Sequence, residues 1–230
     1  MKLNQNGLLI VLSGPSGVGK GTVRRALFDI KGHNLTYSIS MTTRKPREGE
    51  VDGEDYYFVS KEEFEQRIKE GKFLEYAEFV GNYYGTPIDK VEESIKAGKE
   101  VVLEIEVEGA KQVKKKKEDA VFIFIAPPSF LALKERLHRR GTEAPEIINE
   151  RLEKAKRELR LINDYDYIVI NDSVDNAANR IMAIIRAEHA RTKRSGAGYI
   201  ELLEETNNEW TWKYALSICR STNWNDNIKI

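Results

Sequence analysis

Residues Gly14 to Thr22, GPSGVGKGT, have the types and spacing that could hold a phosphate group. In the pattern G-x-x-x-x-G-K-[ST], the glycines let successive backbone N–H groups point at an anion, and the lysine bridges the outer phosphates. Gly21 stands at the position where a serine or threonine hydroxyl would bind Mg²⁺. The segment is therefore either a phosphate loop with a different metal arrangement or an ordinary glycine-rich turn.

The surroundings of this segment favour the phosphate loop. A continuous apolar run over residues 8–12 is typical of a strand buried on both faces of a parallel sheet. Apolar residues then recur at helical spacing from Val23 to Ile30. A helix that starts directly after such a loop turns its positive end toward an anion. We predict an ATP-binding loop with Lys20 as a catalytic cation, formed by Gly14, Pro15, Ser16, Gly17, Val18, Gly19, Lys20, Gly21 and Thr22.

A second group of charged and hydroxyl side chains follows in Ser40 to Arg47, SMTTRKPR. By itself this segment is typical of a solvated basic turn. Tyrosines, a glutamate and a threonine then follow in residues 53–58, 73–76 and 81–87. These neighbouring segments argue against that reading.

With these segments the chain resembles the guanylate kinases, enzymes that move a phosphoryl group from ATP to GMP. The similarity runs from about Gly7 to Arg194. It rests on segments in the family's order, namely GPSGVGKGT, SMTTRKPREGEVDGEDYYFVS, EFVGNYYGTP, LEIEVEGA, FIAPPS, RLHRRGTE and VIND. The resemblance implies a core parallel sheet that carries a mobile GMP-binding lobe and a lid.

The resemblance also implies which residues bind GMP. Guanidinium groups bind a phosphate bidentately, and tyrosine hydroxyls add neutral donors. A carboxylate can accept from both N1–H and the 2-amino group of guanine, whereas AMP would leave it unpaired. The phosphate-binding positions are Arg44, Arg47, Tyr56 and Tyr84, and the guanine-reading positions are Ser40, Glu75, Thr86 and Glu106. The family often has the shorter aspartate at the last of these positions.

Arginines at the expected lid complete the implied site. Arg136, Arg140 and Arg151 match positions that contact the ATP phosphates, although residues 134–140 could also be a solvated helix face. Asn171 and Asp172 fall near the adenine pocket of the family, and a strand-end turn explains them equally well. Because the GMP phosphate is already anionic, the transfer needs no general base. Mg²⁺ is expected with ATP, and Glu104 is the candidate for organising its waters.

Two other readings remain open at this point. A non-catalytic guanylate-kinase-like interaction domain would share the fold, but such domains typically lack a competent phosphate loop. The second reading is a kinase for another nucleoside monophosphate, because the GKGT stretch also resembles that of adenylate kinases. Residues 40–47 and 75–86 argue against that second reading.

The elements that must position these residues alternate between strand and helix, so we predict an α/β fold with a mostly parallel central sheet flanked by helices. Expected strands cover residues 101–107, 121–125 and 167–170, besides the first. Helices are expected after the Ser60 capping box as far as Gly71, from the Thr86 N-cap to Gly98, and over 129–139, 145–162 and 174–193. The expected domain covers residues 1–194, with an inserted lobe at about 37–95 and a lid at about 138–150. Residues 195–230 form a tail outside the resemblance.

The composition fits a protein of the reducing cytoplasm. Lysine plus arginine equals aspartate plus glutamate, so bulk charge favours neither a nucleic-acid nor a membrane partner. The single cysteine, Cys219, excludes an internal disulfide, and the three histidines lack metal-ligand spacing. All three tryptophans lie beyond residue 194, where self-association as a homo-oligomer is one possible role.

Overall fold

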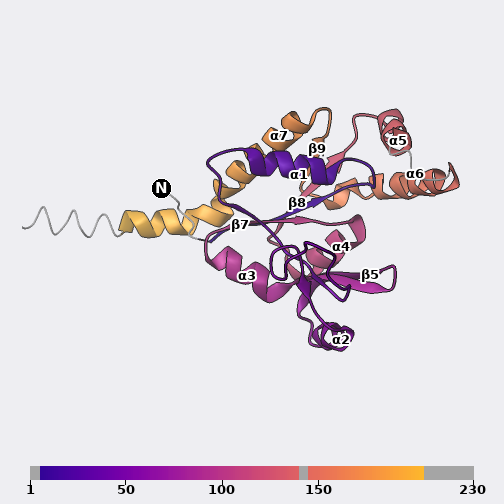
Figure 1. Ribbon diagram of the computed structural model, residues 1–230. Helices are drawn as coiled ribbons and strands as arrows, with labels where there is room; N and C mark the ends of the chain where they lie inside the picture. Colours follow the sequence, from indigo (N-terminus) through magenta and orange to yellow (C-terminus); the bar gives the residue numbers. More distant parts are fainter. Residues whose placement is uncertain (1–5, 140–144, 205–230) are drawn as a thin grey trace, which may run out of the picture. The chain divides into compact units, whose positions relative to one another are not determined.

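The computed structural model describes residues 6–139 and 145–204 (Figure 1). Their contacts divide them into two compact units, residues 6–186 and residues 187–204. The first unit contains a core sheet and a lobe. In the second unit, residues 192–204 are helical, and the Glu188 carboxylate accepts hydrogen bonds from Arg191 and Arg194.

A five-stranded sheet forms the centre of the first unit, in the order β2-β7-β1-β8-β9. All four neighbouring pairs are parallel, which confirms the predicted class of sheet. The strands are β1 (Leu9–Ser13), β2 (Leu35–Tyr37), β7 (Glu100–Glu104), β8 (Val121–Ala126) and β9 (Tyr167–Ile170). The chain reverses its direction of travel across the sheet at β1, and ligands of such sheets bind beyond the carboxyl ends of the strands at that point.

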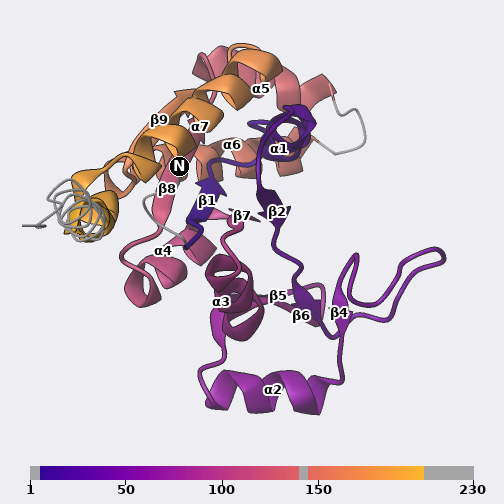
Figure 2. The ribbon, with the colours of Figure 1, turned by 90° about the vertical axis from the view of Figure 1, so that its left-hand side faces the viewer.

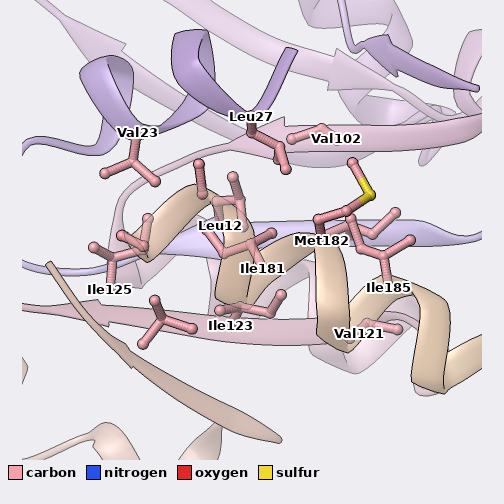
Figure 3. Close-up of a cluster of buried hydrophobic side chains, with 14 of the residues drawn as sticks. Leu12, Val23, Leu27, Val102, Val121, Ile123, Ile125, Ile181, Met182 and Ile185 are labelled. Carbon is pink, nitrogen blue, oxygen red and sulfur yellow. The ribbon is translucent and has the colours of Figure 1, made fainter. Parts of the chain in front are cut away.

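Helices cover both faces of this sheet because its central strands are apolar on both sides. On one face, Ile10 and Leu12 pack with residues of α1 (Lys20–Asp29) and α7 (Val174–His189). Figure 3 shows Leu12 between these two helices. On the other face, Leu9 and Val11 pack against α3 (Ile88–Lys96) and α4 (Val107–Lys116). The sheet therefore holds the end of β1 rigidly between two packed layers.

The inserted lobe has a sheet of its own (Figure 2). Its order is β4-β3-β6-β5, with β3 antiparallel to β6 and parallel to β4. The elements are β3 (Met41–Thr42), β4 (Tyr57–Phe58), α2 (Lys61–Lys69), β5 (Phe73–Phe79) and β6 (Asn82–Pro87). Phe64 of α2 is fully buried between the rings of Phe73 and Tyr83, at centroid distances of 4.3 and 5.3 Å. This aromatic stack is the centre of the lobe's core.

Several expected boundaries were wrong. The strand expected over residues 101–107 ends at Glu104, and Val107 already belongs to α4, because its apolar residues at positions 107, 110 and 113 lie on one helical face. Thr86 is not a helix N-cap: β6 continues to Pro87, which caps α3. The helix expected up to residue 193 ends at His189.

The last helices of the first unit follow β8. They are α5 (Phe130–Arg139), α6 (Pro145–Leu159) and the short 3-10 helix η1 (Ile162–Asp164), so the helix expected over 145–162 is interrupted after Leu159. Leu133 and Leu137 of α5 pack against Ile148 and Leu152 of α6. Within the described ranges, no helix is both long enough and apolar enough to cross a membrane.

Candidate functional site

The predicted phosphate loop lies at the carboxyl end of β1 and leads into α1 at Lys20. Gly19 has a φ of 95°, and a Cβ at Gly17 would lie 2.6 Å from Leu137 Cδ2, so side chains at these positions would strain the loop. No side chain caps the first turn of α1, and that turn contains no acidic residue. The amino end of α1 is therefore suited to an anion.

The Lys20 side chain is folded back along this loop. Its ammonium donates to the carbonyl oxygen of Gly14 at 2.7 Å and lies 3.4 Å from that of Pro15. Burial lowers the pKa of Lys20, and the nearby Glu106 carboxylate opposes that shift. The cation is thus close to the position in which a bound phosphate would replace its carbonyl partners.

Two of the predicted arginines reach the same loop from α5 and α6. Arg136 donates to the carbonyl oxygens of Val18 and Asn171, at 3.0 and 2.9 Å. Arg151 donates to Ser16 Oγ at 2.8 Å. The Asn171 amide also donates to the Val18 carbonyl, and its own oxygen is buried without a hydrogen-bond partner. These contacts join the loop to the helices that follow it.

A pocket of about 420 Å³ opens beside the loop. It is lined by Ser16, Gly17, Gly19, Lys20, Gly21, Thr22, Arg24, Arg25, Glu104, Ile105 and Glu106. A Cβ at Gly21 would lie 3.3 Å from Glu104 Oε1, so a carboxylate oxygen occupies the space beside the missing hydroxyl. The other oxygen of Glu104 accepts from Arg24 Nε at 2.7 Å.

This arrangement fits a hydrated Mg²⁺ that is held mainly by the phosphates of ATP. Glu104 could accept hydrogen bonds from the waters of such an ion, since its Oε1 lies beside the loop. A cage made of protein ligands is absent from the described residues, in which no three histidine, cysteine, aspartate or glutamate side chains gather.

The lobe brings together the side chains expected to bind the acceptor phosphate. Arg44 forms a bidentate ion pair with Glu50, at 3.0 and 2.8 Å, and its guanidinium carbon lies 5.4 Å from the centre of the Tyr56 ring. The Tyr56 and Tyr84 rings lie edge to face, 6.1 Å apart. The Arg44 guanidinium holds the pKa of the Glu50 carboxyl below its usual range. Arg47 is exposed, and its backbone N–H donates to the same carboxylate.

Glu75 and Thr86, expected to read guanine, are buried neighbours on β5 and β6. Thr86 Oγ1 donates to Glu75 Oε1 at 2.6 Å, and burial raises the pKa of Glu75. Glu75 Oε2 lies over the first turn of α4, 3.2 Å from where a Cβ of Gly109 would be. Ser40 is half-buried, and its carbonyl oxygen accepts from the backbone N–H of Tyr57.

Glu106 is the N-cap residue of α4 and lines the pocket beside Lys20. Its Oε2 accepts from Lys154 Nζ at 2.7 Å. This hydrogen bond is the main reason that the pKa of Glu106 is lowered.

Asp172 and Arg140 are the remaining expected residues. Asp172 forms an exposed ion pair with Arg180, and Arg140 is outside the described residues. Sequence reasoning missed Arg24, Glu50 and Lys154, the partners of three site residues. Their charges occur in polar stretches that look like ordinary surface, and only the folded structure brings them to the site.

Comparisons with known proteins place the chain in one family. The family model described as guanylate kinase matches residues 6–188. A guanylate kinase of Onion yellows phytoplasma (strain OY-M) is 59% identical over 206 residues, which cover 89% of this chain and 97% of the relative. One from Streptococcus agalactiae serotype III (strain NEM316) is 55% identical, with coverage of 89% and 98%.

A crystal structure of guanylate kinase from Anaplasma phagocytophilum is similar in fold, with a TM-score of 0.67 and 37% identity. The match covers 89% of this chain and 97% of that one. These relatives have the names of enzymes, so they do not support the reading as a non-catalytic interaction domain. The chain belongs to the guanylate kinase family of P-loop kinases.

Proposed function

We propose that this protein transfers the γ-phosphoryl group of ATP to GMP, or to dGMP, and releases ADP and GDP. The observation that carries the proposal is the pairing of two sites in the lobe. The Glu75–Thr86 pair is suited to the guanine edge, and the cluster of Arg44, Tyr56 and Tyr84 is suited to a phosphate. The phosphate loop of the core supplies the matching donor site.

On the donor side, the backbone of the loop and the amino end of α1 bind the ATP phosphates. Lys20 then moves from the Gly14 carbonyl to the outer phosphates. Arg136 and Arg151 reach the loop from the other side, where they can neutralise charge on the transferring group. We assign the same role to Arg140. Mg²⁺, bound with ATP, would neutralise further phosphate charge.

On the acceptor side, the GMP phosphate oxygen is the nucleophile and is already anionic. Arg44, Arg47, Tyr56 and Tyr84 bind this phosphate and reduce its repulsion from ATP. Catalysis then consists of in-line alignment, charge neutralisation and exclusion of water.

Base recognition explains the preference for guanine. The ionised Glu75 accepts from N1–H and the 2-amino group, while the Ser40 hydroxyl can donate to O6 and the Thr86 hydroxyl keeps its bond to Glu75. Adenine has an acceptor at N1 and lacks the 2-amino group, so AMP leaves a buried carboxylate unpaired. Such a mismatch supports discrimination on the order of 10⁴-fold.

A substrate panel tests the proposal. ADP release is measured with GMP, dGMP, AMP, UMP and dTMP as acceptors, each in the presence of ATP and Mg²⁺. Turnover confined to GMP and dGMP is expected. A preference for AMP, UMP or dTMP would reassign the acceptor, and no turnover with any acceptor would refute a kinase activity.

A further inference from the structure

Lys154 is a residue of α6 with no role assigned so far. Its ammonium lies 2.7 Å from Glu106 Oε2 and 3.8 Å from Glu158 Oε1. Glu158 is buried, so the packing around it fixes its carboxylate beside the Lys154 ammonium. Lys154 therefore lies between a carboxylate of the candidate site and a carboxylate of the protein interior.

The position of Glu106 gives this contact its significance. As N-cap of α4, Glu106 lines the pocket that also contains Lys20. Gly109, one turn further along α4, lies against the Glu75 carboxylate. Glu106 is thus located where the phosphate pocket and the proposed base site meet.

Glu106 has three cations within electrostatic reach, namely Lys154, Lys20 and Arg151. The Lys20 ammonium contacts the carbonyl oxygens of Gly14 and Pro15, whereas Lys154 binds the Glu106 carboxylate directly. If the Glu106 carboxylate formed an ion pair with Lys20, it would neutralise the cation that ATP needs. It would also place a negative charge beside the phosphates. Lys154 offers the carboxylate a different partner.

We propose that Lys154 is a positioning residue, which holds the Glu106 carboxylate in place for the base of the acceptor nucleotide. The inference rests on the proposed function and on the expectation that Glu106 also reads guanine, where it would accept the second hydrogen of the 2-amino group while Glu75 accepts the first. Lys154 contacts Glu106 and not the substrate, so it acts on base recognition through that carboxylate.

The 2-amino group of guanine makes this role measurable. Inosine monophosphate is GMP without this group, so it offers a carboxylate one donor fewer. A correctly positioned Glu106 should favour GMP over inosine monophosphate. If Glu106 is no longer held in position, kcat/KM for GMP should fall and kcat/KM for inosine monophosphate should stay nearly unchanged.

The test compares Lys154→Gln with the unmodified chain, using kcat and KM for both acceptors at saturating ATP. The ratio of kcat/KM for GMP to that for inosine monophosphate should fall about 3- to 10-fold, mainly through the KM of GMP. Lys154→Arg should retain most of the ratio, because a guanidinium can also bind the carboxylate. A ratio within twofold of wild type in Lys154→Gln would overturn the proposal.

Lys156→Gln is the matched control. It makes the same change on the same helix, but Lys156 pairs with Glu153 at 2.6 Å and not with Glu106. An equal fall of the ratio in this variant would refute a specific role for Lys154. Thermal melts show whether the variants remain folded, and the Lys154→Arg variant still decides the case if Lys154→Gln does not fold.

Glu106→Gln separates the guanine-reading role of Glu106 from the positioning role of Lys154. If this variant leaves the ratio unchanged, Glu106 does not read guanine, and both that assignment and the inference fail. If it lowers the ratio and Lys154→Gln does not, the inference alone fails. In the Glu106→Gln background, Lys154→Gln should cause no further fall, since the carboxylate that it positions is gone.

Discussion

Individual side chains of the site already have partners inside the protein. Lys20 and Arg136 bind backbone carbonyls, Arg151 binds a serine hydroxyl, and Arg44 binds a carboxylate. Such contacts restrict the rotamers of long side chains before a nucleotide binds, which lowers the entropy lost on binding. Changes at single residues of this network should therefore alter binding and catalysis more than folding.

Replacement of the loop lysine tests the donor site. Lys20→Met removes the cation and keeps most of the length of the side chain, so kcat should fall by roughly 10²-fold or more. The melting temperature should stay close to that of the unmodified chain. Steady-state kinetics and a thermal melt check both expectations, and near-normal turnover would refute the assignment of Lys20.

Gly109→Ala separates function from stability. An added Cβ would lie 3.2 Å from Glu75 Oε2, so the carboxylate must shift. We expect the KM for GMP to rise about fivefold, equivalent to about 1 kcal/mol. Alanine favours helix over glycine by up to about 1 kcal/mol, so the melting temperature should not fall. An unchanged KM would show that Glu75 can move freely.

The pH dependence of GMP use reports on Glu75. Guanine needs the ionised carboxylate, whose pKa is raised by burial and lowered again by Thr86 and Lys116. Thr86→Val removes one of the lowering contacts, so the pKa should rise further. The acidic limb of kcat/KM for GMP should then move to higher pH than in the unmodified chain. A limb that stays in place, or moves to lower pH, contradicts this role of Glu75.

At the scale of the elements, the sequence predicted the parts whose signals are local. The apolar run before Gly14 and the helix after it are found as β1 and α1. Residues 101–107, VVLEIEV, looked like one strand. The alternation from Leu103 to Val107 fits period two, and the same residues also fit the approach to a helix. The contacts of Lys154 and Glu50 could not be predicted, because they depend on packing between distant segments or on the exact loop geometry.

The aromatic stack of the lobe should control acceptor binding more than donor binding. Phe64→Ala removes the ring that packs between Phe73 and Tyr83, at a cost of about 3–5 kcal/mol for a buried phenylalanine. The KM for GMP should rise at least tenfold, whereas ATP binding should change less. Titrations with GMP and a non-hydrolysable ATP analogue measure the two effects. Equal losses of affinity for GMP and for the ATP analogue would show that the substitution does not loosen the lobe independently of the core.

At the scale of the whole molecule, residues 205–230 lie outside the family match, which ends at residue 188. We expect a chain truncated after Glu204 to retain kcat and both KM values within about twofold, because every described site residue lies before that point. The assay is the same ADP-release measurement, combined with light scattering for the association state. A large loss of activity would assign residues 205–230 a catalytic or assembly role.

The ion pair between Arg44 and Glu50 has a consequence for selectivity among the anions of the cell. Inorganic phosphate and other small anions that encounter the lobe find Arg44 already neutralised by a carboxylate in bidentate contact. Each must compete with Glu50 through a single phosphate-like group. Under the proposed function, GMP competes with more, because its base would also bind Glu75 and Thr86. We therefore expect the Glu50 carboxylate to lower the occupancy of the acceptor site by inorganic phosphate.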